Sequence, residues 1–175
     1  MESSTITIRR ASQHDVRALS KKLLVLLMDK NGEVYKDNVA KFGIPEEYVK
    51  RAFSEATLLE ATGPGKSTIY LALQNRCKIA GFAQTNYNDN ETTELDRIVV
   101  FPEFTRQGIG TRFLDRIVQD ERLKGTKTII VNAGKDETHA RQFYEKNGFT
   151  FVREVTMDAP WGSRLGLVTY HLKLA

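Results

Sequence analysis

Residues 94–123, "ELDRIVVFPEFTRQGIGTRFLDRIVQDERL", contain the change of pattern that decides the fold. The apolar run that ends at Val100 is typical of a strand, and the segment after Thr111 has the apolar spacing of an amphipathic helix. Between them lie Gly108 and Gly110, flanked by small, polar or cationic side chains. The stretch therefore predicts a strand that passes into a helix through a tight glycine turn.

The glycine turn is a candidate anion-binding site. The N–H groups from Arg106 to Thr111 would lie at the start of a helix, where backbone donors have no intrahelical acceptor. Because Gly108 and Gly110 lack a β-carbon, a phosphate could approach the backbone directly. Charge-assisted hydrogen bonds contribute roughly 1.5–3 kcal/mol each, more than the ~0.3–1 kcal/mol of a helix dipole, and Arg106 and Arg112 could add to them. Taken alone, however, the two glycines fit a plain tight turn better than a binding site.

The chain as a whole has the size and composition of one folded unit. It contains 175 residues, 41% of them hydrophobic and 27% charged, which is enough to bury a core. We therefore expect a single domain over residues 1–175. The net charge of +4 comes from basic residues spread along the chain. This spread argues against nucleic-acid binding and favours a local basic site for a polyanionic small molecule.

Several classes of protein are disfavoured by the residue inventory. Cys77 is the single cysteine, so an intrachain disulfide is excluded and no zinc cluster is expected. The three histidines are scattered without metal-ligand spacing, so we expect no metal. The start of the chain lacks the apolar core of a signal peptide, and no apolar run approaches the roughly 20 residues that span a bilayer. A cytoplasmic protein without membrane association is the expectation.

Hydrophobic periodicity predicts helices first and mostly strands afterwards. Helices are expected at residues 16–30, at 46–61, from the glycine turn to about residue 123, and at 136–148. The segment 31–45 reads as loop with some helix. Strands are expected at residues 6–11, 67–75, 78–87, 93–101, 126–134, 149–157 and 165–174, the second to fourth of them as an antiparallel meander.

Two carboxylates precede the glycine turn. In a regular strand Glu94, Asp96 and Ile98 would share one face. Leu95 and Arg97 would lie on the other. A pair of carboxylates just before an anion site could include a general base, although a solvated strand end explains them equally well.

Tyr144 is the third candidate. A phenol with an ordinary pKa near 10 is protonated at neutral pH, as a general acid must be. Tyr144 shares a helix face with Ala140 and Phe143, so core packing is the alternative explanation.

Taken together, these elements resemble the GNAT superfamily of acetyl-CoA-dependent N-acetyltransferases. The family motif Q/R-x-x-G-x-G/A is matched at both glycines by residues 105–110, with Thr105 at its first position. A second family pattern, N-x-x-A-x-x-x-Y-x-x-x-G-F, is matched by Ala140, Tyr144, Gly148 and Phe149. Glu137 stands where that pattern has Asn. The stretch "TTELDRIVV" also resembles the E-L-x-R-I-x-V segment of bacterial polyamine acetyltransferases.

The resemblance implies an α/β three-layer fold with a mixed, mostly antiparallel sheet of six to seven strands flanked by about four helices. It also implies that the strand before the glycine turn bulges, that the strand at 126–134 splays away from it, and that acetyl-CoA binds between them with its pyrophosphate on the glycine turn. The implied coenzyme-binding residues are Ile98, Val99, Val100, Arg106, Gln107, Gly108, Ile109, Gly110, Thr111, Asn132, Glu137 and Tyr144.

The implied chemistry is direct attack of a neutral amine on the thioester in a ternary complex. An alkylamine with a pKa near 10.4 is almost fully protonated at neutral pH, so a base is needed. Glu94 is the first choice and Asp96 the second, directly or through water. Tyr144 would protonate the leaving thiolate, and the N–H of Val99 or Val100 would bind the oxyanion.

The resemblance leaves the acceptor open. A polyamine or another small amine is the first expectation, and acetylation of a peptide or protein N-terminus is the main alternative. A non-catalytic acyl-CoA sensor with the same fold is the competing class, and a homodimer is compatible with the sequence.

Overall fold

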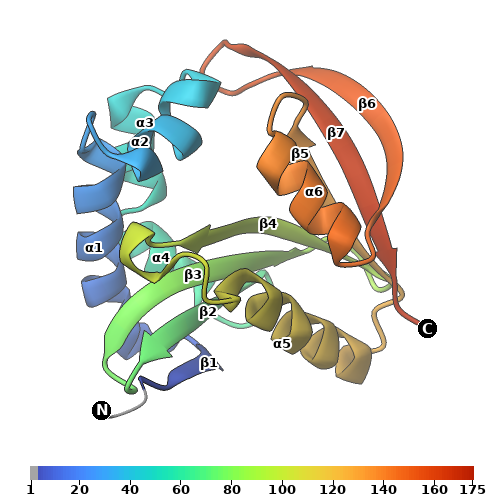
Figure 1. Ribbon diagram of the computed structural model, residues 1–175, viewed down its shortest axis with the longest axis horizontal. Coiled ribbons are helices and arrows are strands. Elements are labelled where there is room, and N and C mark those ends of the chain that lie inside the picture. The colour runs from blue at the N-terminus through green and yellow to red at the C-terminus, as the bar shows by residue number, and fades with distance from the viewer. Residues whose placement is uncertain (1–3) are drawn as a thin grey trace.

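The computed structural model describes residues 4–175, and Figure 1 shows how its strands and helices are arranged. The strands are β1 (Ile6–Arg10), β2 (Ser67–Gln74), β3 (Lys78–Tyr87), β4 (Thr92–Val100), β5 (Thr128–Gly134), β6 (Thr150–Asp158) and β7 (Arg164–Lys173). They form one seven-stranded sheet in the order β1-β2-β3-β4-β5-β7-β6. Only the pairing of β4 with β5 is parallel. The mixed, mostly antiparallel sheet expected from the sequence is confirmed.

Helices cover both faces of the sheet. They are α1 (Val16–Met28), α2 (Glu33–Asn38), α3 (Glu46–Ala52), α4 (Glu55–Ala61), α5 (Ile109–Lys124) and α6 (Thr138–Lys146). Helices α1 to α4 gather on one side of strands β1 to β4, and α5 packs against the other side (Figure 1). No helix within residues 4–175 combines the length and hydropathy that crossing a membrane requires.

The helix expected at residues 46–61 is two helices, which corrects that prediction. Phe53 and Ser54 leave the helical conformation, and Ser54 is extended with φ −66° and ψ 156°. The Ser54 hydroxyl accepts a hydrogen bond from the Thr57 N–H at 3.2 Å, so it caps the second helix. A serine placed to satisfy a helix start competes with helix continuation. With α2 in the segment expected to be partly helical, the described chain has six α-helices where about four were expected.

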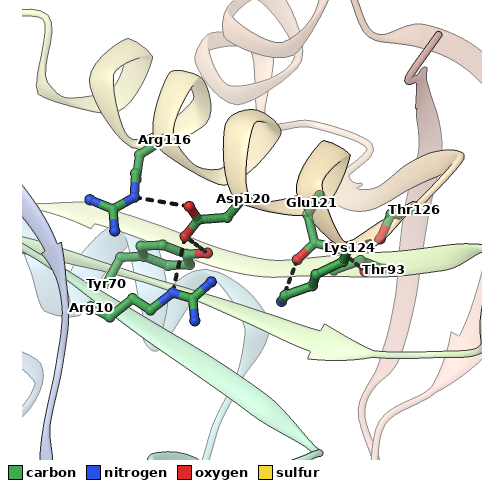
Figure 2. Close-up of polar contacts among 8 residues, drawn as sticks. All are labelled: Arg10, Tyr70, Thr93, Arg116, Asp120, Glu121, Lys124 and Thr126. Carbon is green, nitrogen blue, oxygen red and sulfur yellow. Dashed lines mark hydrogen bonds and ion pairs between the residues drawn. The ribbon is translucent and has the colours of Figure 1, made fainter.

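Asp120 fixes α5 to the first two strands. Its side chain is almost buried, and it accepts hydrogen bonds from Arg10 Nε at 3.0 Å, Tyr70 Oη at 3.0 Å and Arg116 Nε at 3.1 Å (Figure 2). Burial alone would raise the pKa of Asp120, but the hydrogen bonds from Tyr70, Arg10 and Arg116 lower it overall. The ionised carboxylate is therefore the form that holds the helix in place.

Glu121 fixes the next position of α5 to β4 and to the start of β5. It is 1% exposed and accepts hydrogen bonds from Thr126 Oγ1 and Thr93 Oγ1, both at 2.6 Å, and from Lys124 Nζ at 3.0 Å (Figure 2). Burial would raise the pKa of Glu121, but these three contacts lower it overall. Because α5 begins at the glycine turn, the two carboxylates set the position of that turn from the far end of the helix.

The sheet opens between its two parallel strands. β4 pairs with β5 only from Thr92 to Leu95, opposite residues 128–131. Beyond that point β4 continues to Val100 without β5, and β5 continues to Gly134 paired with β7 alone. The strand separation expected from the sequence is therefore present, and it exposes one edge of β4 directly before the glycine turn.

Candidate active site

β4 contains an extra residue at Asp96. Thr85 of β3 lies opposite Leu95 and Gln84 lies opposite Arg97, so Asp96 has no partner residue across the ladder. This arrangement is a β-bulge, which interrupts the alternation of side chains. The expectation that Arg97 lies on the face opposite Asp96 is wrong, because both side chains line the same cavity.

The bulge also determines which backbone groups of β4 face the opening. The Phe101 N–H donates to the Ala80 carbonyl of β3 at 2.9 Å. Backbone groups alternate in direction along an antiparallel ladder, so the Val99 N–H points to β3 as well. The N–H and C=O groups of Ile98 and Val100 then point into the space between β4 and β5. Of the two residues considered for binding an oxyanion, Val100 is the one whose N–H faces that space.

A continuous groove follows the open edge of β4. One cavity of about 420 Å³ extends from Arg97 to Tyr144 and Trp161. A second cavity of about 520 Å³ extends from Val100 to Thr105, beside the glycine turn. The two cavities share the lining residues Asn38, Ile98, Val99, Glu137 and Ala140. We call the first of them the acceptor cavity.

The glycine turn presents backbone donors without acceptors. Arg106 has φ +63° and Gly108 has φ +72°, so the chain twice enters the left-handed region before α5. None of the N–H groups from Arg106 to Thr111 donates a hydrogen bond within residues 4–175, and the first to do so is that of Arg112, to the Gly108 carbonyl at 3.1 Å. Such a run of unsatisfied donors at a helix start favours an anion.

The two glycines of the turn are required for different reasons. A β-carbon on Gly108 would meet no atom within 4 Å, but the positive φ there is strained for any side chain. A β-carbon on Gly110 would lie 3.1 Å from the ring of Phe143 in α6. Gly110 therefore allows α5 to approach α6, whereas Gly108 provides the open backbone. Sequence reasoning had assigned both glycines to phosphate approach.

Tyr144 is part of the core and also lines the acceptor cavity. Its ring packs against Phe143, Phe149 and Tyr170, with centroid distances of 5.4, 5.4 and 6.4 Å. Burial, and then the charge of Glu137, raises the pKa of Tyr144 above its ordinary value, so the phenol is protonated. No described residue hydrogen-bonds its hydroxyl, and no polar side-chain atom of the described chain is fully buried without a partner. The hydroxyl is therefore reached from the cavity.

The two carboxylates of β4 lie at different depths relative to the cavity. Asp96 lines the acceptor cavity and forms an ion pair with Arg97 at 2.9 Å. Glu94 does not line that cavity and is half-buried two residues away. Burial, and then the charge of Asp96, raises the pKa of Glu94, while Arg97 opposes the shift. Asp96 is thus the carboxylate in direct contact with the cavity. The charge of Asp96 in turn affects the pKa of Glu94.

Asn132 and Glu137 line the acceptor cavity, and one side-chain oxygen of each accepts a hydrogen bond from the protein. Asn132 Oδ1 accepts from Thr169 Oγ1 at 2.6 Å, and Glu137 Oε1 accepts from the Gly134 N–H at 2.8 Å. Glu137 therefore caps the last residue of β5. Among residues 4–175, no group of three or more His, Cys, Asp or Glu side chains is arranged to hold a metal ion.

An aromatic wall encloses the acceptor cavity, and sequence reasoning did not identify most of its members. Its residues are Phe42, Tyr48, Phe53, Phe82 and Trp161. They come from α3, from the segments before and after it, from β3 and from the β6–β7 connection, so no spacing along the chain groups them.

The chain matches one protein family over most of its length. The sequence profile of the acetyltransferase (GNAT) family matches residues 33–149. The ribosomal protein bS18-alanine N-acetyltransferase of Escherichia coli is 30% identical over 97 residues, which cover 55% of this chain and 64% of that protein. The match therefore spans less than two thirds of this relative.

Solved structures share the fold. PaiA N-acetyltransferase from Thermoplasma acidophilum, in complex with coenzyme A, has a TM-score of 0.69 and 21% identity, covering 97% of this chain and 99% of that one. A spermidine N-acetyltransferase from Vibrio cholerae has a TM-score of 0.70 and 14% identity, covering 97% and 94%. At these identities the similarity establishes the architecture.

Proposed function

Because the chain belongs to the acetyltransferase (GNAT) family, we propose that it transfers the acetyl group of acetyl-CoA to a primary amine in a ternary complex. One observation carries the proposal. Two cavities with shared lining residues extend from Tyr144 and Asp96, along the open edge of β4, to Thr105, the residue that precedes the unsatisfied backbone donors of the glycine turn.

Each part of the groove fits a part of the coenzyme. The N–H groups from Arg106 to Thr111 would hold the pyrophosphate, with Arg106 and Arg112 nearby as counter-charges. The backbone of Ile98 and Val100 would pair with the amide-bearing pantetheine arm, as one strand pairs with another. This placement brings the thioester to the acceptor cavity, beside Tyr144.

Residues in and beside the acceptor cavity can carry the protons of the transfer. The ammonium group of the acceptor first loses one proton to Glu94 or Asp96, which passes it to solvent. The amine nitrogen then bonds to the acetyl carbon while the carbon–sulfur bond breaks, and the Val100 N–H donates to the carbonyl oxygen. The second proton of the nitrogen passes to the same carboxylate as the amide forms. Tyr144 gives its proton to the sulfur and regains one from solvent. Glu94 is our first choice of base, acting through water because it does not line the cavity, and its raised pKa favours proton uptake.

The buried phenol is a competent donor to the departing sulfur. The ordinary pKa values of a phenol and a thiol differ by about 1.5 units, or about 2 kcal/mol. Burial raises both values, since each anion loses solvation in the same cavity. The raised pKa of Tyr144 therefore does not by itself increase the mismatch.

Two acceptor classes are suggested by the relatives. The relative from Escherichia coli is named for an alanine of a ribosomal protein, which suggests a peptide N-terminus. The structure from Vibrio cholerae is that of a spermidine N-acetyltransferase, which suggests a polyamine. A screen of polyamines, amino acids and short peptides with acetyl-CoA, read as release of free thiol, tests the proposal. Coenzyme binding without thiol release on any acceptor would instead indicate an acyl-CoA sensor.

Replacing Gly108 with Val is expected to weaken coenzyme A binding at least 10-fold. The side chain would stand over the donors at the start of α5 and would strain a left-handed position. Gly125→Val is the matched control, because Gly125 has φ +84°, also has open space at its β-carbon, and ends the same helix. Calorimetric titration should show the loss only in the Gly108 variant. Equal affinities of the two variants for coenzyme A would contradict the assignment of the glycine turn as the pyrophosphate site.

Replacing Glu94 with Gln is expected to lower kcat about 10²-fold without lowering the melting temperature. The rate falls because a general base is lost. Because the pKa of Glu94 is raised in the folded state, folding disfavours the ionised carboxylate. Glu94 therefore lowers the free energy of unfolding as the pH rises through this raised pKa. A neutral amide removes this cost at pH 7. Undiminished turnover in Glu94→Gln, with a loss in Asp96→Asn, would transfer the base role to Asp96.

A further inference from the structure

One ion pair lies in the otherwise aromatic acceptor cavity. Asp96 Oδ2 accepts from Arg97 Nη2 at 2.9 Å and from Arg97 Nε at 3.1 Å. Oδ1 of Asp96 and Nη1 of Arg97 take no part in these bonds. Because no polar side-chain atom of the described chain is fully buried without a partner, these two atoms are accessible. The pair therefore offers one free acceptor atom and one free donor atom.

Arg97 is held in position by packing as well as by charge. Its guanidinium lies 4.8 Å from the centroid of the Phe53 ring, a cation–π contact that fixes the plane of the group. Arg97 is the one cationic residue in the lining of the acceptor cavity. Glu137, the other anion in that lining, is turned toward the Gly134 N–H. Asp96, Arg97 and Glu137 together set the electrostatic character of the cavity, and the charge of Glu137 also acts on Tyr144.

The β6–β7 connection borders the acceptor cavity through Trp161. Trp161 Nε1 donates to the Phe42 carbonyl at 3.0 Å, and the rings of Trp161 and Tyr48 lie 4.9 Å apart. A β-carbon on Gly43 would lie 3.0 Å from Ser163 Oγ, so the two segments approach closely. Figure 1 shows the same connection reaching toward α2 and α3. These contacts hold Trp161 in the lining of the cavity.

We propose that the acceptor is a free α-amino acid with a large apolar side chain. Its ammonium group would bind Asp96 Oδ1 and its carboxylate would bind Arg97 Nη1, while its side chain would pack against the aromatic wall. The proposal rests on the proposed acetyltransferase function and names its substrate class. The volume of about 420 Å³ is within the ordinary range for a small-molecule site.

The other acceptor classes fit the cavity less well. A polyamine would bring a second ammonium group, for which Glu137 is the second carboxylate in the lining, but it would leave Arg97 Nη1 without an anion. A peptide N-terminus has no carboxylate beside its amine, so it would leave Arg97 Nη1 without a ligand.

The test compares acceptors that differ only at the carboxylate. For the wild type, kcat/KM is measured with L-phenylalanine, L-phenylalaninamide and 2-phenylethylamine at saturating acetyl-CoA. We expect L-phenylalanine to be preferred. In Arg97→Gln the ratio of kcat/KM for the acid over the amide should fall about 30-fold, the loss of one charge-assisted hydrogen bond. Arg97→Lys keeps the charge and should restore part of the ratio.

Arg51→Gln is the matched control. Arg51 also stacks on an aromatic ring, at 5.6 Å from the centroid of Tyr48, but it does not line the acceptor cavity. In Arg51→Gln the ratio of kcat/KM for L-phenylalanine over L-phenylalaninamide should equal that of the wild type. If Arg97→Gln does not fold, the wild-type preference for L-phenylalanine and the kcat/KM ratio of acid over amide in Arg97→Lys still test the amino-acid assignment.

Failure of the inference is distinguishable from failure of the proposed function. Turnover of polyamines or peptides in preference to L-phenylalanine, or an unchanged ratio in Arg97→Gln, would overturn the amino-acid assignment and leave the acetyltransferase standing. Absence of turnover with every acceptor in the wild type would overturn both.

Discussion

The Tyr144→Phe variant is expected to lose about 10²- to 10³-fold in kcat while its affinity for coenzyme A changes less than about 2-fold. The substitution removes the hydroxyl that would protonate the leaving sulfur, and general acids contribute on this scale. It keeps the ring that packs against Phe143, Phe149 and Tyr170. Thiol release gives kcat, and calorimetric titration with coenzyme A gives the dissociation constant.

Tyr170→Phe separates this chemical role from a packing role. Tyr170 is fully buried and lies 6.4 Å from Tyr144, but its hydroxyl donates to Glu145 at 2.7 Å and accepts from Arg141 at 3.1 Å. It does not line the acceptor cavity. Removing the Tyr170 hydroxyl should lower the melting temperature and leave kcat within a few-fold of the wild-type value. Undiminished kcat in Tyr144→Phe would remove Tyr144 from the acid role.

The Glu121→Gln variant should show a large loss of stability, about 3 kcal/mol. Two hydroxyls and one ammonium group donate to this almost fully buried carboxylate. An amide cannot accept all of them and leaves the Lys124 charge without its partner. For a chain of this length the melting temperature should fall by about 6–12 °C. Asp115→Asn, on the exposed face of the same helix, is the control and should melt like the wild type.

The same carboxylates give the fold a dependence on pH with a defined sign. The pKa values of Asp120 and Glu121 are lowered in the folded state, so their stabilisation is complete above the ordinary carboxyl pKa near 4. It is lost as the pH falls through the lowered folded values. Denaturant titrations between pH 7 and pH 3 should show a smaller decline for Glu121→Gln than for the wild type. Equal stability of the two proteins at pH 7 would contradict the role assigned to Glu121.

Local patterns predicted much of the architecture. The strand, glycine turn and helix at residues 94–123 and the helix that contains Tyr144 were found from periodicity and turn residues. The resemblance to GNAT acetyltransferases rested on these segments and is confirmed by the family match. These features depend on residues close together in the chain, which is why the sequence alone could indicate them. The single-domain assignment and the roles of individual residues stay predictions.

The features that sequence reasoning missed depend on contacts between distant segments. The bulge that the resemblance implied in the strand before the glycine turn is confirmed, but its position at Asp96 is set by the register of β4 against β3 and was not indicated by the sequence. The need for glycine at position 110 comes from Phe143 in another helix. The contact of Trp161 with Phe42 joins residues far apart in the sequence. None of these contacts leaves a periodic or short-range signal.

The most direct test of the account is to follow an isotope-labelled acetyl group from acetyl-CoA by mass spectrometry. The wild-type protein is incubated with the labelled coenzyme and a mixture of amino acids, polyamines and peptides. We expect the labelled acetyl group on the amine nitrogen of an acceptor, with one acetyl group transferred for each thiol released. In Tyr144→Phe, acetyl transfer and thiol release should both be about 10²-fold slower. A protein that binds the coenzyme while all of the label stays in acetyl-CoA, or is lost only as acetate, would contradict it.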